Sequence, residues 1–353
     1  MRIRSTVSVG VRGAGIVDVV PLVDAPSSVL VSCSDGSLTI VDVAGARIER
    51  RVSVSRGGTG PNGIVAVERD LVVRCGWEMV DAIDLETGSE RWVIDEGDHS
   101  LDFEAGGCWA SPGEPYAVLP NGQVIDTRSG APAAGRPFVR DPGNGPWTVL
   151  TACTTSPSRG LLAALDDGSV LAWDARRSGA NSENLSTPPG VARAVAWMGE
   201  RAAAVIEDGS VHLLARGGAA TPVRPPLRRG GEVLLGIGLA ASDDARVLAI
   251  ACELQDGDHV RYVVEGVDEL ASPARRLLEE GPFPVSADHF TAAHFLPPDL
   301  LVVVMPGRLF GFRHGQTWAP LEMPALAHAS TATLRVGSEL LVGDAAGALH
   351  LIG

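Results

Sequence analysis

The feature that most constrains the fold of this chain is a glycine-centred turn between two apolar runs, which recurs eight times along 353 residues. Each copy has a β-branched run, a turn and an alternating run, as in VLVSCSDGSLTIVD and LLAALDDGSVLAWD. A tight hairpin turn needs positive φ, which glycine adopts without a Cβ clash. The turn glycines, 40 to 50 residues apart, are Gly36, Gly76, Gly122, Gly168, Gly209, Gly257, Gly307 and Gly347. The sequence therefore predicts an all-β repeat protein.

An upstream alternating run and usually a downstream one flank each hairpin, so each unit has four predicted strands. In the first unit these strands are IVDVVPLV, SVLVSCS, SLTIVD and ARIERRV. Units of this length and strand number are typical of the blades of a β-propeller. We predict a closed β-propeller of eight four-stranded blades. Seven blades is the alternative, if the Gly76 or the Gly257 unit is not a complete blade.

The last unit contains TATLRV, ELLVGDA and ALHLIG and is one strand short. The N-terminal segment RIRSTVSV can supply the missing strand, which would close the ring and leave no open end blade. We expect a single domain over residues 1–353. Its predicted blades span approximately 11–55, 62–96, 98–140, 146–189, 190–228, 232–280, 283–324, and 327–353 together with 2–9.

The net charge of the chain indicates which kinds of molecule it can bind. The formal net charge of -14 argues against nucleic acid, because phosphate-backbone binders need basic patches that displace counterions. It favours a protein partner with a basic or neutral surface. All 29 basic residues are arginine, typical of a high-GC, bacterial coding bias. The absence of lysine excludes a Schiff-base lysine, a Ser/Lys dyad and a GxxxxGK[ST] phosphate loop.

Location is predicted from the N-terminus and the cysteines. MRIRSTVSVGVRG has neither an apolar core nor a small-residue cleavage site, and no stretch reaches the ~18 apolar residues that span a bilayer. The odd number of cysteines is typical of buried thiols in a reducing compartment. We therefore expect a cytoplasmic protein that does not enter a membrane. The cysteines are Cys33, Cys75, Cys108, Cys153 and Cys252.

Three segments carry a family resemblance. AIDLETGSERW (Ala82 to Trp92) resembles the repeat of pyrroloquinoline-quinone-type propellers, in which an Asp, a Thr-Gly turn and a following Trp brace a blade. QVIDTRSG (Gln123 to Gly130) is similar to it, and LAWD (Leu171 to Asp174) resembles the Trp-Asp ending of a WD40 repeat. The resemblance implies the WD40/PQQ-like propeller superfamily and no individual member. It does not imply the quinone, because this chain has no adjacent cysteine pair.

Catalytic motifs are mostly missing. The sequence contains no GxSxG, HExxH, CxxC or EF-hand pattern. GTGPNG (Gly58 to Gly63) satisfies GxGxxG, but it precedes a strand-like run, whereas a dinucleotide site needs that string to open a helix. No cofactor is predicted.

A candidate site lies on the predicted connections between blades, which meet at the mouth of the central channel. Histidines and carboxylates there could bind a divalent metal or perform acid–base chemistry on a small molecule. The competing interpretation is that they are solvated loop residues. The candidates are His99, Asp102, Trp147, Asp288, His289 and His328. Elsewhere, His212, His259, His314 and His350 alternate with apolar neighbours in third strands and are expected on exposed blade faces.

Arginines gather in the predicted fourth strands, where they either form a basic partner-binding belt or protect open strand edges from aggregation. They are Arg47, Arg50, Arg51, Arg91, Arg136, Arg140, Arg224, Arg228, Arg229, Arg275 and Arg276, with Arg2 and Arg4 in the closing strand.

The leading functional hypothesis is a non-enzymatic scaffold that presents its loop-rich face to another protein. The alternative is a small-molecule enzyme or binding protein with a His/Asp site at the channel mouth, which works either with or without a metal ion.

Overall fold

The computed structural model describes fourteen ranges of the chain. These are residues 1–11, 13–54, 61–68, 70–76, 79–95, 109–110, 115–119, 122–133, 150–156, 160–174, 182–268, 274–285, 290–315 and 317–353. Every regular element in them is a β-strand, so the predicted all-β class is confirmed. No described helix is long and apolar enough to cross a membrane.

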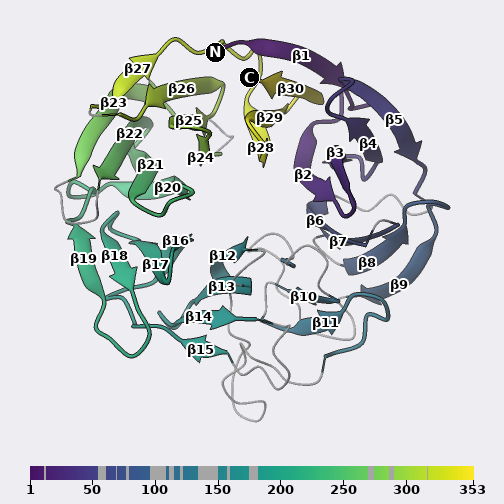
Figure 1. The fold of residues 1–353 in the computed structure, drawn as a ribbon, viewed down its shortest axis with the longest axis horizontal. Coiled ribbons are helices and arrows are strands. Elements are labelled where there is room, and N and C mark those ends of the chain that lie inside the picture. The colour runs from purple at the N-terminus through teal and green to yellow at the C-terminus, as the bar shows by residue number, and fades with distance from the viewer. Residues whose placement is uncertain are drawn as a thin grey trace.

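The described strands form eight antiparallel sheets, which Figure 1 shows arranged around a common centre. The first four sheets are β2 (Ile16–Leu22), β3 (Ala25–Cys33), β4 (Leu38–Asp42) and β5 (Arg47–Val52); β6 (Pro61–Glu68), β7 (Leu71–Gly76), β8 (Met79–Asp84) and β9 (Glu90–Asp95); β10 (Tyr116–Val118) and β11 (Val124–Asp126); and β12 (Leu150–Ser156), β13 (Gly160–Leu165), β14 (Val170–Trp173) and β15 (Glu183–Asn184).

The other four sheets are β16 (Ala192–Met198), β17 (Arg201–Ile206), β18 (Val211–Leu214) and β19 (Thr221–Arg224); β20 (Val233–Ala241), β21 (Val247–Asp256), β22 (His259–Asp268) and β23 (Arg275–Pro284); β24 (Ala292–Leu296), β25 (Leu300–Met305), β26 (Arg308–Arg313) and β27 (Ala319–Leu321); and β28 (Ser330–Val336), β29 (Glu339–Asp344) and β30 (Ala348–Ile352) with β1 (Ile3–Ser8). Isolated bridges from Trp109 to Val118 and from Ile125 to Pro132 extend the two-stranded sheet on both sides.

The two ends of the chain share a sheet. Strand β1 pairs antiparallel with β30, from Ile3 opposite Ile352 to Ser8 opposite Ala348. The predicted pairing of the N-terminal strand with the last unit is therefore confirmed. Val9, just beyond β1, is fully buried and donates a backbone hydrogen bond to the Gly347 carbonyl.

Seven of the eight repeated glycines lie between the second and third strands of their sheets, and Gly76 is the last residue of the second strand, β7. Gly36, Gly168 and Gly209 have φ values of 80°, 84° and 78°. The aspartates before them, Asp35, Asp167 and Asp208, each accept a hydrogen bond from the backbone N–H two residues on. The Asp-Gly-Ser strings therefore form hairpins because glycine supplies the predicted positive φ and the preceding carboxylate satisfies a turn amide.

The core is divided into apolar clusters between neighbouring sheets. Each of eight clusters combines buried residues from two sheets that follow each other in the chain, or from the last sheet and the first. The cluster that joins the ends includes Val7, Val31 and Leu351. Because second and third strands are covered on both faces, their sequences are almost continuously apolar; all four residues of β18 are buried.

A tryptophan braces two successive sheets at the segment that carries the family resemblance. The Trp92 indole N–H, on β9, donates to the Thr127 carbonyl at 2.9 Å. A Cβ on Gly130, where φ is +70°, would lie only 2.7 Å from the Trp92 ring. Gly88 holds the equivalent turn position in its own sheet, with a φ of +72°. The Trp of one repeat thus packs on the glycine turn of the next.

Arginine–carboxylate pairs also join the sheets. The buried Arg74 guanidinium donates to Asp81 in its own sheet at 2.9 Å and to the Gly36 carbonyl of the preceding sheet at 3.2 Å. Arg224 on β19 donates to Glu265 on β22 at 2.8 Å, and both side chains are buried. Arg224, which was predicted either to join a basic partner-binding belt or to protect an open edge, instead connects two sheets.

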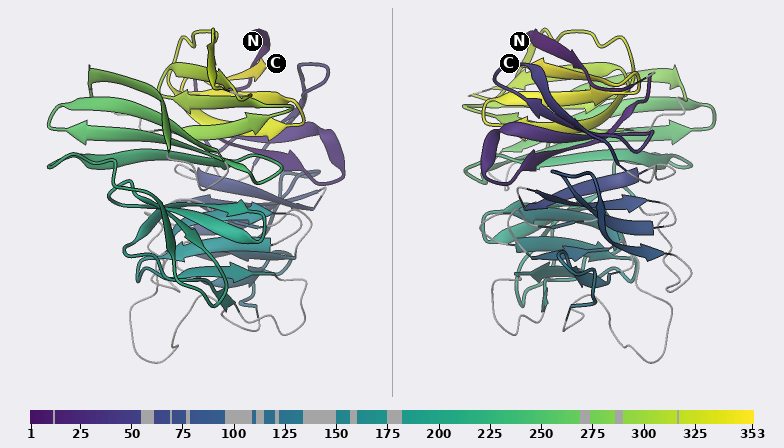
Figure 2. Two further views of the ribbon diagram at one scale, coloured as in Figure 1. Left: turned by 60° about the vertical axis from the view of Figure 1, so that its left-hand side comes forward. Right: turned by 90° about the vertical axis from the view of Figure 1, so that its right-hand side faces the viewer.

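One sheet is longer than the others. β21, β22 and β23 each have ten residues, whereas β25 and β26 of the next sheet have six. Gly238 packs on Ala292, and their cross-strand partners are Ala251 and Val304. From Ala251, β21 continues for five residues to Asp256, whereas from Val304, β25 continues for only one, to Met305. The β20–β23 sheet therefore extends beyond its neighbour by roughly 13 Å, at about 3.3 Å per residue. Figure 2 shows this green sheet projecting from the ring.

Candidate functional site

The predicted channel-mouth site falls almost entirely outside the described residues. His99, Asp102, Trp147, Asp288 and His289 are all there, so their convergence stays a prediction. The sixth residue, His328, is exposed in the bend that precedes β28. Within the part of the chain that the structure describes, no three His, Cys, Asp or Glu side chains are grouped so that they could hold a metal ion.

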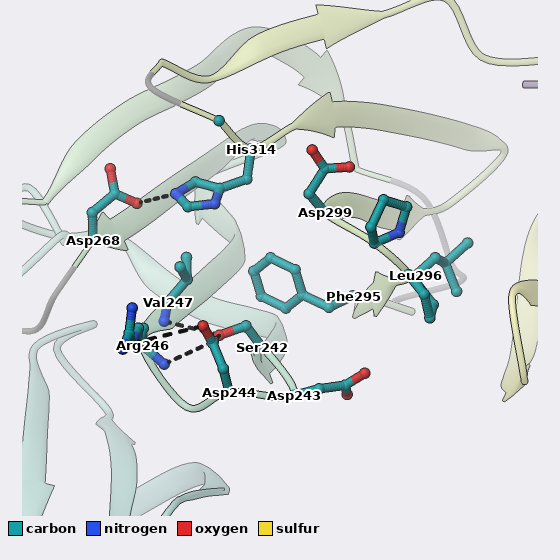
Figure 3. A pocket seen from close by; sticks show the side chains of 13 residues that line it. Ser242, Asp243, Asp244, Arg246, Val247, Asp268, Phe295, Leu296, Asp299 and His314 are labelled. Carbon is teal, nitrogen blue, oxygen red and sulfur yellow. Dashed lines mark hydrogen bonds and ion pairs between the residues drawn. The ribbon is translucent and has the colours of Figure 1, made fainter.

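The described residues do form a pocket, at a different place. It has a volume of about 520 Å³ and lies between the β20–β23 and β24–β27 sheets. Its lining comes from the β20–β21 turn, the end of β22, the β24–β25 turn and the end of β26. These are first-to-second and third-to-fourth connections, so the pocket opens on the face opposite the repeated glycine turns. In the view of Figure 3, the Phe295 ring lies centrally, with His314 and Asp268 above it and Asp244 below it.

One wall of the pocket is formed by His314 and Asp268, which Trp318 supports from outside the lining. His314 Nε2 lies 3.0 Å from Asp268 Oδ1, and the Trp318 indole N–H donates to the same oxygen at 3.2 Å. The His314 and Trp318 rings are 4.7 Å apart. Trp318 also packs so closely on Gly266 that a Cβ there would lie 2.6 Å from its ring. This wall is rigid because a packed indole holds the carboxylate.

A second wall is the β20–β21 turn, where the carboxylates are also occupied. Asp244 accepts hydrogen bonds from the Ser242 hydroxyl at 2.6 Å and from the Arg246 backbone at 3.2 Å, and these bonds lower its pKa. Asp243 accepts two bonds of 2.8 Å from Arg335 on β28, which lower the pKa of Asp243. Both groups are ionised acceptors whose geometry is set by the turn and, for Asp243, by an arginine from the sheet after next.

The third wall is the β24–β25 turn. It contains Pro297, Pro298 and Asp299 beside the buried Phe295. The Asp299 carbonyl accepts the His314 backbone N–H at 2.8 Å, which fixes the turn against the end of β26. Among the described residues, the Asp299 carboxylate has no hydrogen-bond or ion-pair partner. The pocket therefore combines an apolar ring, proline edges and one available carboxylate.

Two histidines expected on exposed faces are buried, and this prediction was wrong. His350 Nε2 lies 3.0 Å from Asp344 Oδ2, and its Nδ1 lies 3.1 Å from the Thr6 hydroxyl. The chemical types and order are those of a nucleophile–His–Asp triad, but Asp344 also caps its own turn through the N–H groups of Ala346 and Ala348. His212 occupies the corresponding third-strand position of its sheet, near the Ser210 hydroxyl. Its burial lowers its pKa.

Sequence reasoning missed the pocket because it searched only the face that bears the inter-blade loops. Paired acidic and proline turns, SDD at 242–244 and PPD at 297–299, are the signal that was available. Both strings join a first strand to a second, and the two sheets are consecutive. The strings therefore had to lie on the same face of neighbouring blades.

No protein-family model matches the chain, and no curated protein matches it. A solved structure of the β-propeller domain of Myceliophteria thermophila Cps50 (Swd1) is similar over 99% of this chain and 98% of that chain, with a TM-score of 0.52 and 11% sequence identity. The computationally designed Ika8 protein is similar over 98% of both chains, with a TM-score of 0.47 and 11% identity. At this identity the likeness to the Cps50 domain shows the fold alone, which is of the β-propeller type.

Proposed function

We propose that this chain is a protein-interaction scaffold: a closed, eight-bladed β-propeller that binds a partner protein through the face bearing the turns between second and third strands. β-Propellers commonly serve as such scaffolds. The similarity between this chain and the Cps50 domain is one of fold. The binding role for this chain rests on its own surface.

Closure with eight blades is supported by three observations. β1 completes the sheet of β28–β30, and apolar clusters join each sheet to the next. The two units on which a seven-bladed ring depended, those of Gly76 and Gly257, are four-stranded sheets. The proposal retains a single domain over residues 1–353 with the blade limits predicted above.

The observation that carries the binding proposal is the projecting β20–β23 sheet. Its far end stands beyond the neighbouring sheet on the face that bears the glycine turns. At that end Val233 is 51% exposed, one of two large apolar residues so exposed in the described chain. His259 is exposed, and Phe283 stacks on Tyr262 with ring centres 5.5 Å apart. A rigid sheet that presents apolar and polar groups together is suited to contact another protein.

The expected partner has a basic or neutral surface, because a net charge of -14 opposes an acidic one. A reducing compartment, such as the cytoplasm, fits the unpaired, buried thiols of Cys33, Cys75 and Cys252. Burial raises the pKa of Cys75 and of Cys252 to about 12, which keeps both in the inert thiol form.

The experiment is cross-linked affinity purification of the tagged full-length protein from its native host, with mass spectrometry. The variants are Val233→Glu on the projecting sheet and Val11→Glu, the other exposed large apolar residue, as matched control. We expect one stoichiometric protein with the wild type and with Val11→Glu, and at least tenfold less of it with Val233→Glu. No stoichiometric partner of the wild type would refute the scaffold function. Equal recovery with both variants would refute the placement on this sheet.

A further inference from the structure

The pocket between the β20–β23 and β24–β27 sheets is a second candidate for recognition, separate from the projecting sheet because it opens on the opposite face. We propose that it binds the guanidinium group of an arginine side chain from a peptide segment. Its volume of about 520 Å³ lies within the range of sites that enclose a small group, roughly 300–1,000 Å³.

The charged side chains that line the pocket favour a cationic ligand. Four carboxylates line the pocket, those of Asp243, Asp244, Asp268 and Asp299. Two arginine side chains oppose them: Arg335 pairs with Asp243, and Arg246 lies 3.9 Å from Asp244. His314 shares Asp268 with the Trp318 indole. Among these four, Asp299 is the carboxylate that has no hydrogen-bond or ion-pair partner among the described side chains.

Shape and chemistry favour a guanidinium group over a metal ion or a simple ammonium group. The carboxylates on the first two walls are already hydrogen-bonded to protein donors, and among the described residues no three such side chains are grouped so that they could hold one ion. A planar guanidinium can form two parallel bonds with one carboxylate and stack on an aromatic ring. Asp299 and Phe295 lie on the same lining and supply these two partners. The two exposed prolines of the β24–β25 turn provide an apolar surface for the methylene stem.

The pocket has a built-in reporter. The Trp318 ring centre lies 6.3 Å from that of Phe295, and its indole N–H donates to Asp268 Oδ1, so a cation stacked on Phe295 changes the surroundings of the indole and its resonance. The chain has seven tryptophans, and the Trp318 signal is assigned from a Trp318→Phe spectrum. The probes are N-acetyl-arginine methylamide, its citrulline analogue, which is neutral and nearly isosteric, and N-acetyl-lysine methylamide.

We expect the arginine probe to shift the Trp318 indole resonance saturably, the citrulline probe to leave it in place, and the lysine probe to bind several-fold more weakly. Asp299→Asn should weaken arginine binding at least tenfold. Asp256→Asn, an exposed carboxylate on the opposite face, is the matched control and should leave the binding unchanged. Unmoved resonances of the other tryptophans establish that each variant is folded.

Three outcomes would overturn the proposal: no saturable shift with arginine, an equal shift with citrulline, or undiminished arginine binding by Asp299→Asn. Lysine binding as tight as arginine binding would overturn the guanidinium assignment. The titration uses the purified chain alone, so its result is independent of whether the affinity purification recovers a partner on the projecting sheet.

Discussion

Replacing Gly130 with alanine tests whether the Trp92 brace holds two sheets together. The new Cβ meets two penalties. The backbone has a φ of +70°, which costs an L-residue about 1–2 kcal/mol. The methyl would also lie 2.7 Å from Trp92 Cδ2 and 2.8 Å from Cε3, and overpacking of a rigid ring costs about 1–3 kcal/mol more.

Gly168→Ala is the matched control, because it shares the positive φ without the contact. Gly168 has a φ of +84°, and the nearest atom to its added Cβ is 3.9 Å away. We expect a loss of about 1–2 kcal/mol at Gly168 and about 2–5 kcal/mol at Gly130. For a two-state chain of 353 residues the larger loss lowers the melting temperature by about 3–7 °C.

Urea unfolding followed by far-UV circular dichroism measures both losses without relying on tryptophan fluorescence. In a Trp92→Leu background the ring is absent, so the cost of Gly130→Ala should fall to that of Gly168→Ala. A Gly130→Ala variant no less stable than Gly168→Ala would refute the brace. So would an excess cost that persists without the indole.

Three further outcomes are expected. Deleting residues 1–9 removes the partner of β30 and two buried valines, so the urea midpoint should fall and aggregation should rise; a fully stable truncation would contradict the shared sheet. Burial lowers the pKa of His294 to about 4 from 6.5, so native stability should be full above pH 6.5 and decline as pH falls toward 4; a His294→Gln variant with the same pH dependence would exclude this histidine as the cause. Cys75 and Cys252 should resist a thiol reagent in the native state and react in urea, as peptide mass spectrometry would show; rapid native labelling would contradict their burial.

The hairpins were predictable because their signals are local. In DGS at 35–37 and at 167–169, the residue that supplies positive φ and the residue that caps the turn are neighbours in sequence. The predicted unit boundaries needed nothing beyond the recurrence of such turns. The pairing of β1 with β30 followed from counting strands, since one unit ended a strand short.

Burial of third-strand histidines was not predictable by the same reasoning. Alternation of polar and apolar residues indicates an exposed face only where one side of a sheet meets water. Each blade packs on its neighbours through both faces, so polar side chains of the third strand are buried as well. His350 on β30 is hydrogen-bonded to Asp344 and to Thr6 of the same sheet. Arg224 was likewise expected at an edge and instead forms a buried pair with a carboxylate of the next sheet.

The order of strands, the turn positions and the meeting of the chain ends were determined by the sequence alone, because each depends on short-range patterns that repeat. The Phe295 pocket, the Trp92 brace and the pairing of Arg335 with Asp243 were decided by tertiary structure. Each depends on side chains from different sheets. Their approach is set by how twisted sheets pack around a common centre, and no spacing within one repeat encodes that geometry.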